Sequence, residues 1–77
     1  MPPFPPIKTK DFVKILELLG FVFIRSTGSH FFYARIGDKR PLIVKPKDKN
    51  IPPFHVKTYL KQIGLDEETF FEMLGGL

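Results

Sequence analysis

The chain of 77 residues contains no cysteine, which excludes both a disulfide framework and a thiolate metal site. It has no apolar run near the roughly 20 residues that cross a bilayer, and its N-terminus lacks the apolar core of a signal peptide. We therefore expect a cytoplasmic protein without a membrane partner. A chain this short buries only about 60% of its unfolded surface. Nine phenylalanines should supply much of the core, and self-association into a homo-oligomer would add to it.

Acidic residues are scarce outside the C-terminal end. Residues 64–77 hold four of the eight acids and no lysine or arginine, so residues 1–63 carry twelve basic and four acidic side chains, a net charge of +8. Such a body attracts polyanions, although the same charge can serve solubility alone. Two histidines and four scattered acids offer no cluster with metal-ligand spacing. We expect neither a metal nor another cofactor.

The apolar periodicity and the turn residues predict a helix, three strands and two further helices. Thr9 is expected to cap the first helix and Gly20 to end it, and Asp66 is expected to cap the last. The expected ranges are a helix over 10–19, strands over 21–26, 29–36 and 40–45, a helix over 53–63, and a short acidic helix after residue 66.

Two tight connections, at 27–28 and 37–38, indicate an antiparallel meander. Each main helix has a single apolar stripe, so both should cover one face of a three-stranded sheet and leave the other open. The fold class is therefore α+β, in the order α-β-β-β-α with a short C-terminal helix. The second strand alternates between two sets that both carry aromatics, so the pattern leaves the exposed face undecided. The two sets are Phe31, Tyr33 and Arg35 on one side and His30, Phe32, Ala34 and Ile36 on the other.

Gly28-Ser29-His30 lies where a hairpin enters the aromatic second strand. A ribonuclease without a metal can use the 2′-hydroxyl of its substrate as nucleophile, and it then needs an acid–base group near neutrality. A histidine, with an ordinary pKa of about 6.5, suits that task. His30 is the candidate catalyst; on the residues alone, a hydrogen-bonded structural histidine is the alternative. His55, at the edge of an apolar stripe, is expected to be a boundary or surface residue.

Lysines on both main helices and after the third strand are candidate RNA contacts, since only a cluster of cations distinguishes binding from ordinary solvation. Ser29 is a candidate for the turn or a phosphate, and Tyr33 is a candidate for base stacking. The candidate lysines are Lys10, Lys14, Lys57 and Lys61 on the helices and Lys45 and Lys47 in and after the third strand, with Lys49 extending the track.

Several motifs follow one another in a familiar order. They are Leu19-Gly20-Phe21 at the end of the first helix, then Arg25, Gly28-Ser29-His30, the aromatics Phe32 and Tyr33, and Leu60-Lys61-Gln62-Ile63-Gly64-Leu65. From Lys8 to about Leu65 the chain resembles the HicA-type toxins of toxin–antitoxin pairs. The resemblance implies a double-stranded-RNA-binding-domain-like fold, cleavage of mRNA with His30 as the catalytic residue, and neutralisation by a HicB-type antitoxin.

On this interpretation residues 1–7 form a proline-rich arm, residues 8–65 the HicA-like domain, and residues 66–77 a short acidic helix that packs on the same domain. The expected function is a toxin that cleaves mRNA without a metal and thereby blocks translation. Two alternatives remain: a non-catalytic RNA-binding module of the same fold, and an inactive family member that only binds a partner.

Overall fold

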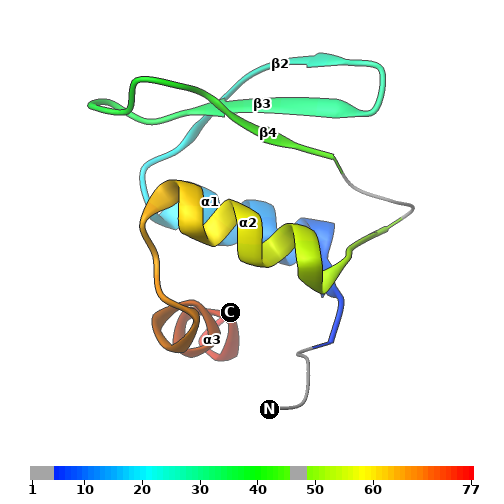
Figure 1. Cartoon of the computed structure of the whole chain (residues 1–77), viewed down its shortest axis with the longest axis vertical. Coiled ribbons are helices and arrows are strands. Elements are labelled where there is room, and N and C mark those ends of the chain that lie inside the picture. The colour runs from blue at the N-terminus through cyan, green and yellow to red at the C-terminus, as the bar shows by residue number, and fades with distance from the viewer. Residues whose placement is uncertain (1–4, 46–48) are drawn as a thin grey trace.

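The computed structural model describes residues 5–45 and 49–77. A three-stranded antiparallel sheet in the order β2-β3-β4 lies on one side of helices α1 and α2, and α3 lies on the other side (Figure 1). The elements are β1 (Ile7–Lys8), α1 (Thr9–Leu18), β2 (Val22–Thr27), β3 (His30–Ala34), β4 (Leu42–Val44), β5 (Asn50–Ile51), α2 (Pro53–Ile63) and α3 (Glu67–Gly75). The predicted α+β class, the antiparallel meander and the order of helices and strands are confirmed.

The core lies between the sheet and the helices and continues to α3. Phe12 of α1 is fully buried, and its ring centroid lies 5.7 Å from that of Tyr59 on α2 and 5.9 Å from that of Phe70 on α3. Tilted aromatic pairs at these separations add to the free energy gained from area burial. A short chain without disulfides thus joins its three helices through three rings, and the acidic helix is part of the core rather than a free tail.

The register of β3 decides which face of the sheet is buried. Tyr33 and Phe31 point toward the helices: Tyr33 is buried and Phe31 packs against the core. Tyr33 pairs with Leu42, and Phe31 pairs with Val44, so two buried residues of β4 share that face. Alternation along β3 then directs His30 and Phe32 to the open face.

The helix boundaries confirm two of the three predicted caps. Gly20 follows α1 with φ at +93°, and the N–H of Phe21 donates to the carbonyl of Leu16 (2.9 Å), which closes the helix end. The Asp66 carboxylate accepts hydrogen bonds from the hydroxyl and backbone N–H of Thr69 (2.7 and 3.1 Å), and these bonds lower the pKa of Asp66. The predicted Thr9 cap is wrong. Thr9 is the first residue of α1, Lys8 is the N-cap, and no side chain within residues 5–45 and 49–77 caps this end.

The strands differ from the predicted ranges at their ends. The two-residue turn is Gly28-Ser29 rather than 27–28, because Thr27 is still paired with His30. Gly28 has φ at +59°, which the turn requires and which glycine adopts without strain. The pairing of β2 with β3 also shifts between Phe23 and Arg25, a β-bulge at Ile24.

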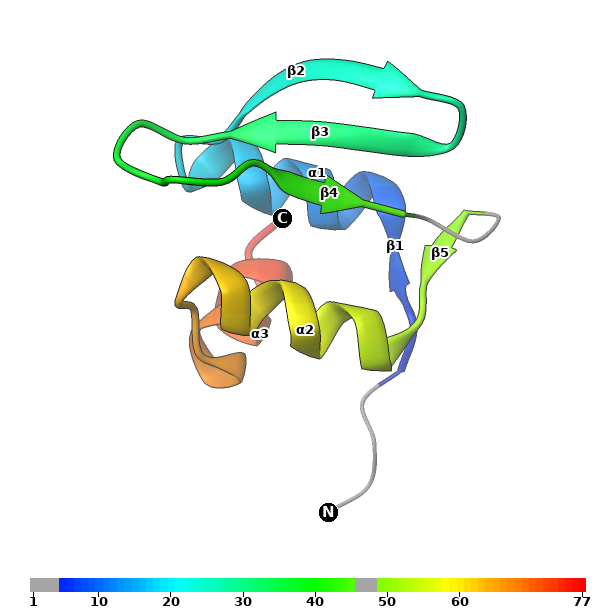
Figure 2. The ribbon, with the colours of Figure 1, turned by 45° about the horizontal axis from the view of Figure 1, so that its top comes forward.

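A second, two-stranded sheet was not predicted. Strands β1 and β5 lie side by side (Figure 2). Ile7 of β1 pairs with Ile51 of β5, and both are buried. The backbone N–H of Thr9 donates to the carbonyl of Lys49 (2.9 Å) beside this pair. The start of the described chain is thereby tied to the segment that leads into α2, and Ile7, placed in the arm by the sequence analysis, belongs to the core.

One end of the sheet is fastened to the helices by Arg35, the residue that follows β3. Its guanidinium lies 4.6 Å from the ring centroid of Phe21 and forms an ion pair with Asp38 (Nε to Oδ2, 3.1 Å). It also donates to the carbonyl of Ile63 at the end of α2 (3.2 Å). A cation at a helix C-terminus is favourable for the helix dipole. Arg35 therefore connects the loop before β2, the β3–β4 loop and α2.

Replacing Arg35 by alanine should lower the free energy of unfolding by about 1–3 kcal/mol, since it removes a charged hydrogen bond, a stacking contact and a half-exposed ion pair. Urea unfolding measures this difference. Arg40→Ala, an exposed arginine of the same loop, is the matched control and should stay within about 0.5 kcal/mol of the parent chain. Equal effects of the two variants would contradict the role given to Arg35.

Candidate functional site

His30 lies at the hairpin corner, the point where the β2–β3 turn enters β3. Its side chain points to the open face of the sheet, the face away from the helices. His30 is the first residue of β3, is half-buried, and lies directly opposite Thr27 of β2. Side chains of directly opposed residues share a face and have Cβ atoms about 5 Å apart. The side chain of Thr27 is therefore the nearest cross-strand neighbour of His30. A histidine in this place is held by two paired strands and still meets solvent.

Arg25 supplies a cation on the same face. It pairs with Phe32, and its guanidinium carbon lies 4.5 Å from the ring centroid of Phe32. Phe32 and His30 are two residues apart on β3 and so point the same way. The guanidinium is held by a neutral ring, and its hydrogen-bond donors remain available for an oxyanion such as a phosphate.

The bulge at Ile24 places Arg25 on this face. Phe23 pairs with Tyr33, which faces the helices, whereas Arg25 pairs with Phe32, which faces away from them. Strict alternation would put residues 23 and 25 on one side, so the extra residue reverses the second of them. In the sequence, Arg25 stands out only as part of the resemblance to a known family. Only the pairing register of β2 with β3 would have shown that Arg25 lies on the same face as His30.

Ser29 and Lys10 come together in a groove beneath the same hairpin corner, on the helix side. Both line it, with Lys49, and the side chains of all three residues are exposed. The structure thus places three predicted RNA-contact residues near one another, across the corner from the side chain of His30.

Lys45 and His55 line a different groove, between β4 and the start of α2. The backbone N–H of Lys45 donates to the hydroxyl of Tyr59 (3.0 Å), which fixes the end of β4 on the helix. His55 is exposed, as the sequence predicts, and its ring lies 6.0 Å from that of Phe54. His55 projects from the helix layer, so it is not on the face that carries His30.

The other predicted lysines lie on exposed surface of the helix layer. Lys14 is on α1, and Lys57 and Lys61 are four residues apart on α2. They lie on the side of the sheet opposite to the side chain of His30, so a single flat RNA contact cannot join them to it. Lys47 lies outside the described residues.

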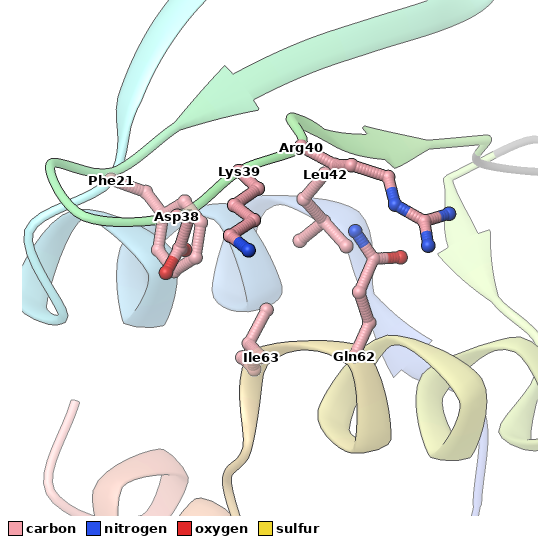
Figure 3. A pocket seen from close by; sticks show the side chains of 7 residues that line it. All are labelled: Phe21, Asp38, Lys39, Arg40, Leu42, Gln62 and Ile63. Atoms are coloured by element: carbon pink, nitrogen blue, oxygen red, sulfur yellow. The ribbon is translucent and has the colours of Figure 1, made fainter.

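A third opening lies at the far end of the sheet from His30, and Figure 3 shows its lining. Lys39 and Gln62 extend into it from the β3–β4 loop and from α2. Its one acid, Asp38, is already paired with Arg35. The amide of Gln62 donates to the carbonyl of Pro41 (3.3 Å). This opening contains no histidine and offers no acid–base pair.

The described ranges, 5–45 and 49–77, contain no group of three or more histidine, aspartate or glutamate side chains that could hold a metal ion. Within the same ranges no helix is both long and apolar enough to cross a membrane.

Tyr33 is not available for base stacking, so that prediction is wrong. Its ring faces the helices with 6% of its surface exposed, and the ring of Phe23 meets it edge-on at 5.6 Å. Burial raises the pKa of the Tyr33 phenol, and the nearby carboxylate of Glu17 adds to the shift. Phe32 has its ring on the open face, and the guanidinium of Arg25 lies over that ring.

The fold and the open face together define a small basic α+β protein with a histidine and an arginine on an uncovered sheet. Comparison with protein families finds a match to the HicA toxin of bacterial toxin–antitoxin systems over residues 9–65. The chain therefore belongs to the HicA toxin family, and membership implies an antitoxin partner. No curated protein and no solved structure matches the chain.

The titration of Tyr33 tests which face of β3 is buried. Its phenol should reach half-ionisation above pH 10.0, because burial disfavours the phenolate. The absorbance of tyrosinate, followed against pH in the parent chain and in Tyr33→Phe, isolates this group from Tyr59. Half-ionisation at or below pH 10 would place the ring in solvent and contradict the register of β3.

Proposed function

We propose that this HicA-family protein is a ribonuclease that cleaves mRNA without a metal, with His30 as its acid–base catalyst and Arg25 as the cation that meets the reacting phosphate. The observation that supports the proposal best is the pairing of β2 with β3. It puts a half-buried histidine and a ring-supported guanidinium on the same open face.

The chemistry follows from what such a face can supply. His30 removes the proton of a ribose 2′-hydroxyl, and the oxygen attacks the adjacent phosphorus. The bond from phosphorus to the 5′-oxygen breaks, which leaves a 2′,3′-cyclic phosphate and a 5′-hydroxyl. Because the face is open, water can protonate the leaving oxygen. Arg25 stabilises the negative charge that grows on the phosphoryl oxygens, an effect that is commonly the largest in such reactions.

The remaining predicted contacts belong to the wider RNA surface. Ser29 and Lys10 lie just below the hairpin corner, and Lys45 lies at the end of β4. Lys14, Lys57 and Lys61 add positive charge to the helix layer, where they attract RNA at long range. In this proposal the nearby cations position the strand, and the more distant ones raise the rate of encounter.

The proposed antitoxin is of the HicB type, and the open face is its proposed docking surface. Val22 is paired with Ala34 at the end of this face away from His30, and 66% of its surface is exposed. Ile36, just beyond β3, is fully exposed. An exposed apolar patch beside a cationic site is typical of a protein-binding surface. A partner seated there would cover Arg25 and His30 and stop cleavage.

His30→Gln should lower the rate of RNA cleavage in EDTA by about a hundredfold or more, the contribution expected of one acid–base group. The assay follows single-stranded RNA with the parent chain and the variant, and anisotropy checks that RNA binding persists. His55→Gln is the matched control, since it removes the other histidine, and it should cleave at the parental rate.

Equal cleavage by His30→Gln and the parent would remove His30 from the mechanism. Binding without cleavage by the parent chain would instead favour a non-catalytic RNA-binding module. Cleavage that disappears in EDTA and returns with Mg²⁺ would contradict a reaction without a metal.

A further inference from the structure

A groove with a volume of about 930 Å³ lies next to the hairpin corner on the helix side. Lys8, Lys10 and Lys49 line it. Each of the three is exposed, and no carboxylate of the described residues, 5–45 and 49–77, contributes to the lining. An open groove with three cations in its lining attracts an anion.

The three lysines come from segments about forty residues apart in the sequence, and the small β1–β5 sheet brings them together. Lys8 pairs with Asn50, which also lines the groove. The hydrogen bond from the N–H of Thr9 to the carbonyl of Lys49 closes the junction (2.9 Å). The spacing of these cations is therefore fixed by backbone pairing, unlike that of isolated surface lysines.

Thr9 adds a polar group that the fold leaves unused. It lines the groove, and its hydroxyl oxygen is shielded from solvent without a hydrogen-bond partner among the described residues. Buried hydroxyls are normally hydrogen-bonded, and one without a partner calls for an explanation. It lies in the first turn of α1, an end that no side chain of the described residues caps and whose dipole favours an anion.

The groove and the proposed catalyst meet at the same corner. Ser29 and Phe31, the two residues adjacent to His30, both line the groove. Consecutive Cα atoms are about 3.8 Å apart, so the groove begins one residue away from His30. Phe31 is only partly buried and presents an aromatic surface to the groove. The side chain of His30 points to the opposite face.

We infer that this groove, which we call the lysine groove, holds the RNA strand on one side of the bond that is cut. The lysines contact the phosphates of that segment, and Phe31 stacks against one of its bases. The inference rests on the proposed function, since it takes His30 as the point from which the strand continues. It adds Lys8 and Phe31 to the substrate site and gives Lys49, a candidate RNA contact from the sequence, a place in it.

The position of the groove selects single-stranded RNA. A strand that meets His30 on the open face and the lysines on the helix face must turn around a two-residue hairpin. A duplex does not bend this sharply, given that the persistence length of DNA is about 50 nm. A single strand bends freely and stacks its exposed bases on aromatic rings.

The test measures how RNA binding depends on salt. All variants carry His30→Gln so that the RNA stays intact, and anisotropy of a labelled single-stranded oligoribonucleotide gives the affinity at several salt concentrations. Lys8→Ala/Lys49→Ala should lower the slope of log affinity against log salt by about 1.4, about 0.7 for each lost phosphate contact. Lys39→Ala/Arg40→Ala, with the same loss of charge at the far end of the sheet, should leave the slope unchanged.

A third variant, Phe31→Leu, keeps an apolar side chain but removes the ring. It should weaken binding about fivefold or more and leave the salt slope unchanged, because stacking releases no counterions. Thermal melting of each variant verifies that the chain is folded.

An unchanged slope in Lys8→Ala/Lys49→Ala, or an equal loss in the far-end control, would overturn the lysine groove as an RNA site. An unchanged slope together with loss of binding to a HicB-type antitoxin would also overturn this proposal, and it would make the groove a protein-binding site. A duplex of the same sequence that loses as much slope as the single strand would overturn the strand specificity. A reduced slope in a protein whose parent chain does not cleave RNA would support the groove and refute the ribonuclease.

Discussion

The register of β3 is the constraint on which the rest of the structure depends. Phe31 and Tyr33 face the helices, and His30 and Phe32 face away from them. Because side chains alternate along a strand, a slip of one residue would exchange these two sets. His30 would then enter the core, and two large rings would meet solvent. The register that buries the rings of Phe31 and Tyr33, and so stabilises the fold, is thus the same register that exposes the candidate catalyst, His30.

Contacts at both ends of β3 hold the strand in this register. At one end the two-residue turn fixes Thr27 opposite His30, and at the other Arg35 fastens the chain to Phe21 and to the end of α2. The bulge at Ile24 then brings Arg25 to the face of His30. A hairpin that carries both groups on paired strands suits the positional precision that catalysis would need, since sites on strands are held better than sites on loops.

Much of the fold was predictable because its signals are local. Pro53 at the first turn and Gly64 after the last residue mark α2, and the predicted range 53–63 is confirmed. The cap at Asp66 is also local. The pairing of Ile7 with Ile51 was not predictable, since two-residue strands show no periodicity and their partners are far apart in the sequence.

In the candidate site, the position of His30 could be predicted from the sequence, but the positions of the side chains around it could not. The turn and the alternation place His30 at a hairpin corner, but neither tells which side of β3 is buried, and the assignment of Tyr33 to base stacking failed for that reason. The face on which Arg25 lies depends on a bulge that breaks the alternation of side chains along β2. Lys8 and Lys49 meet only through the small second sheet. Long-range pairing therefore determines everything around the histidine.

The central claim is that the open face cuts RNA by acid–base chemistry on the substrate's own 2′-hydroxyl. The most direct measurement uses a single-stranded RNA with one mapped cleavage site, compared in EDTA with the same strand carrying a single 2′-deoxynucleotide on the 5′ side of that bond. We predict that the unmodified strand yields 2′,3′-cyclic phosphate and 5′-hydroxyl ends and that the modified strand stays intact at that site. Cleavage of the modified bond, or products with 5′-phosphate ends, would contradict this account.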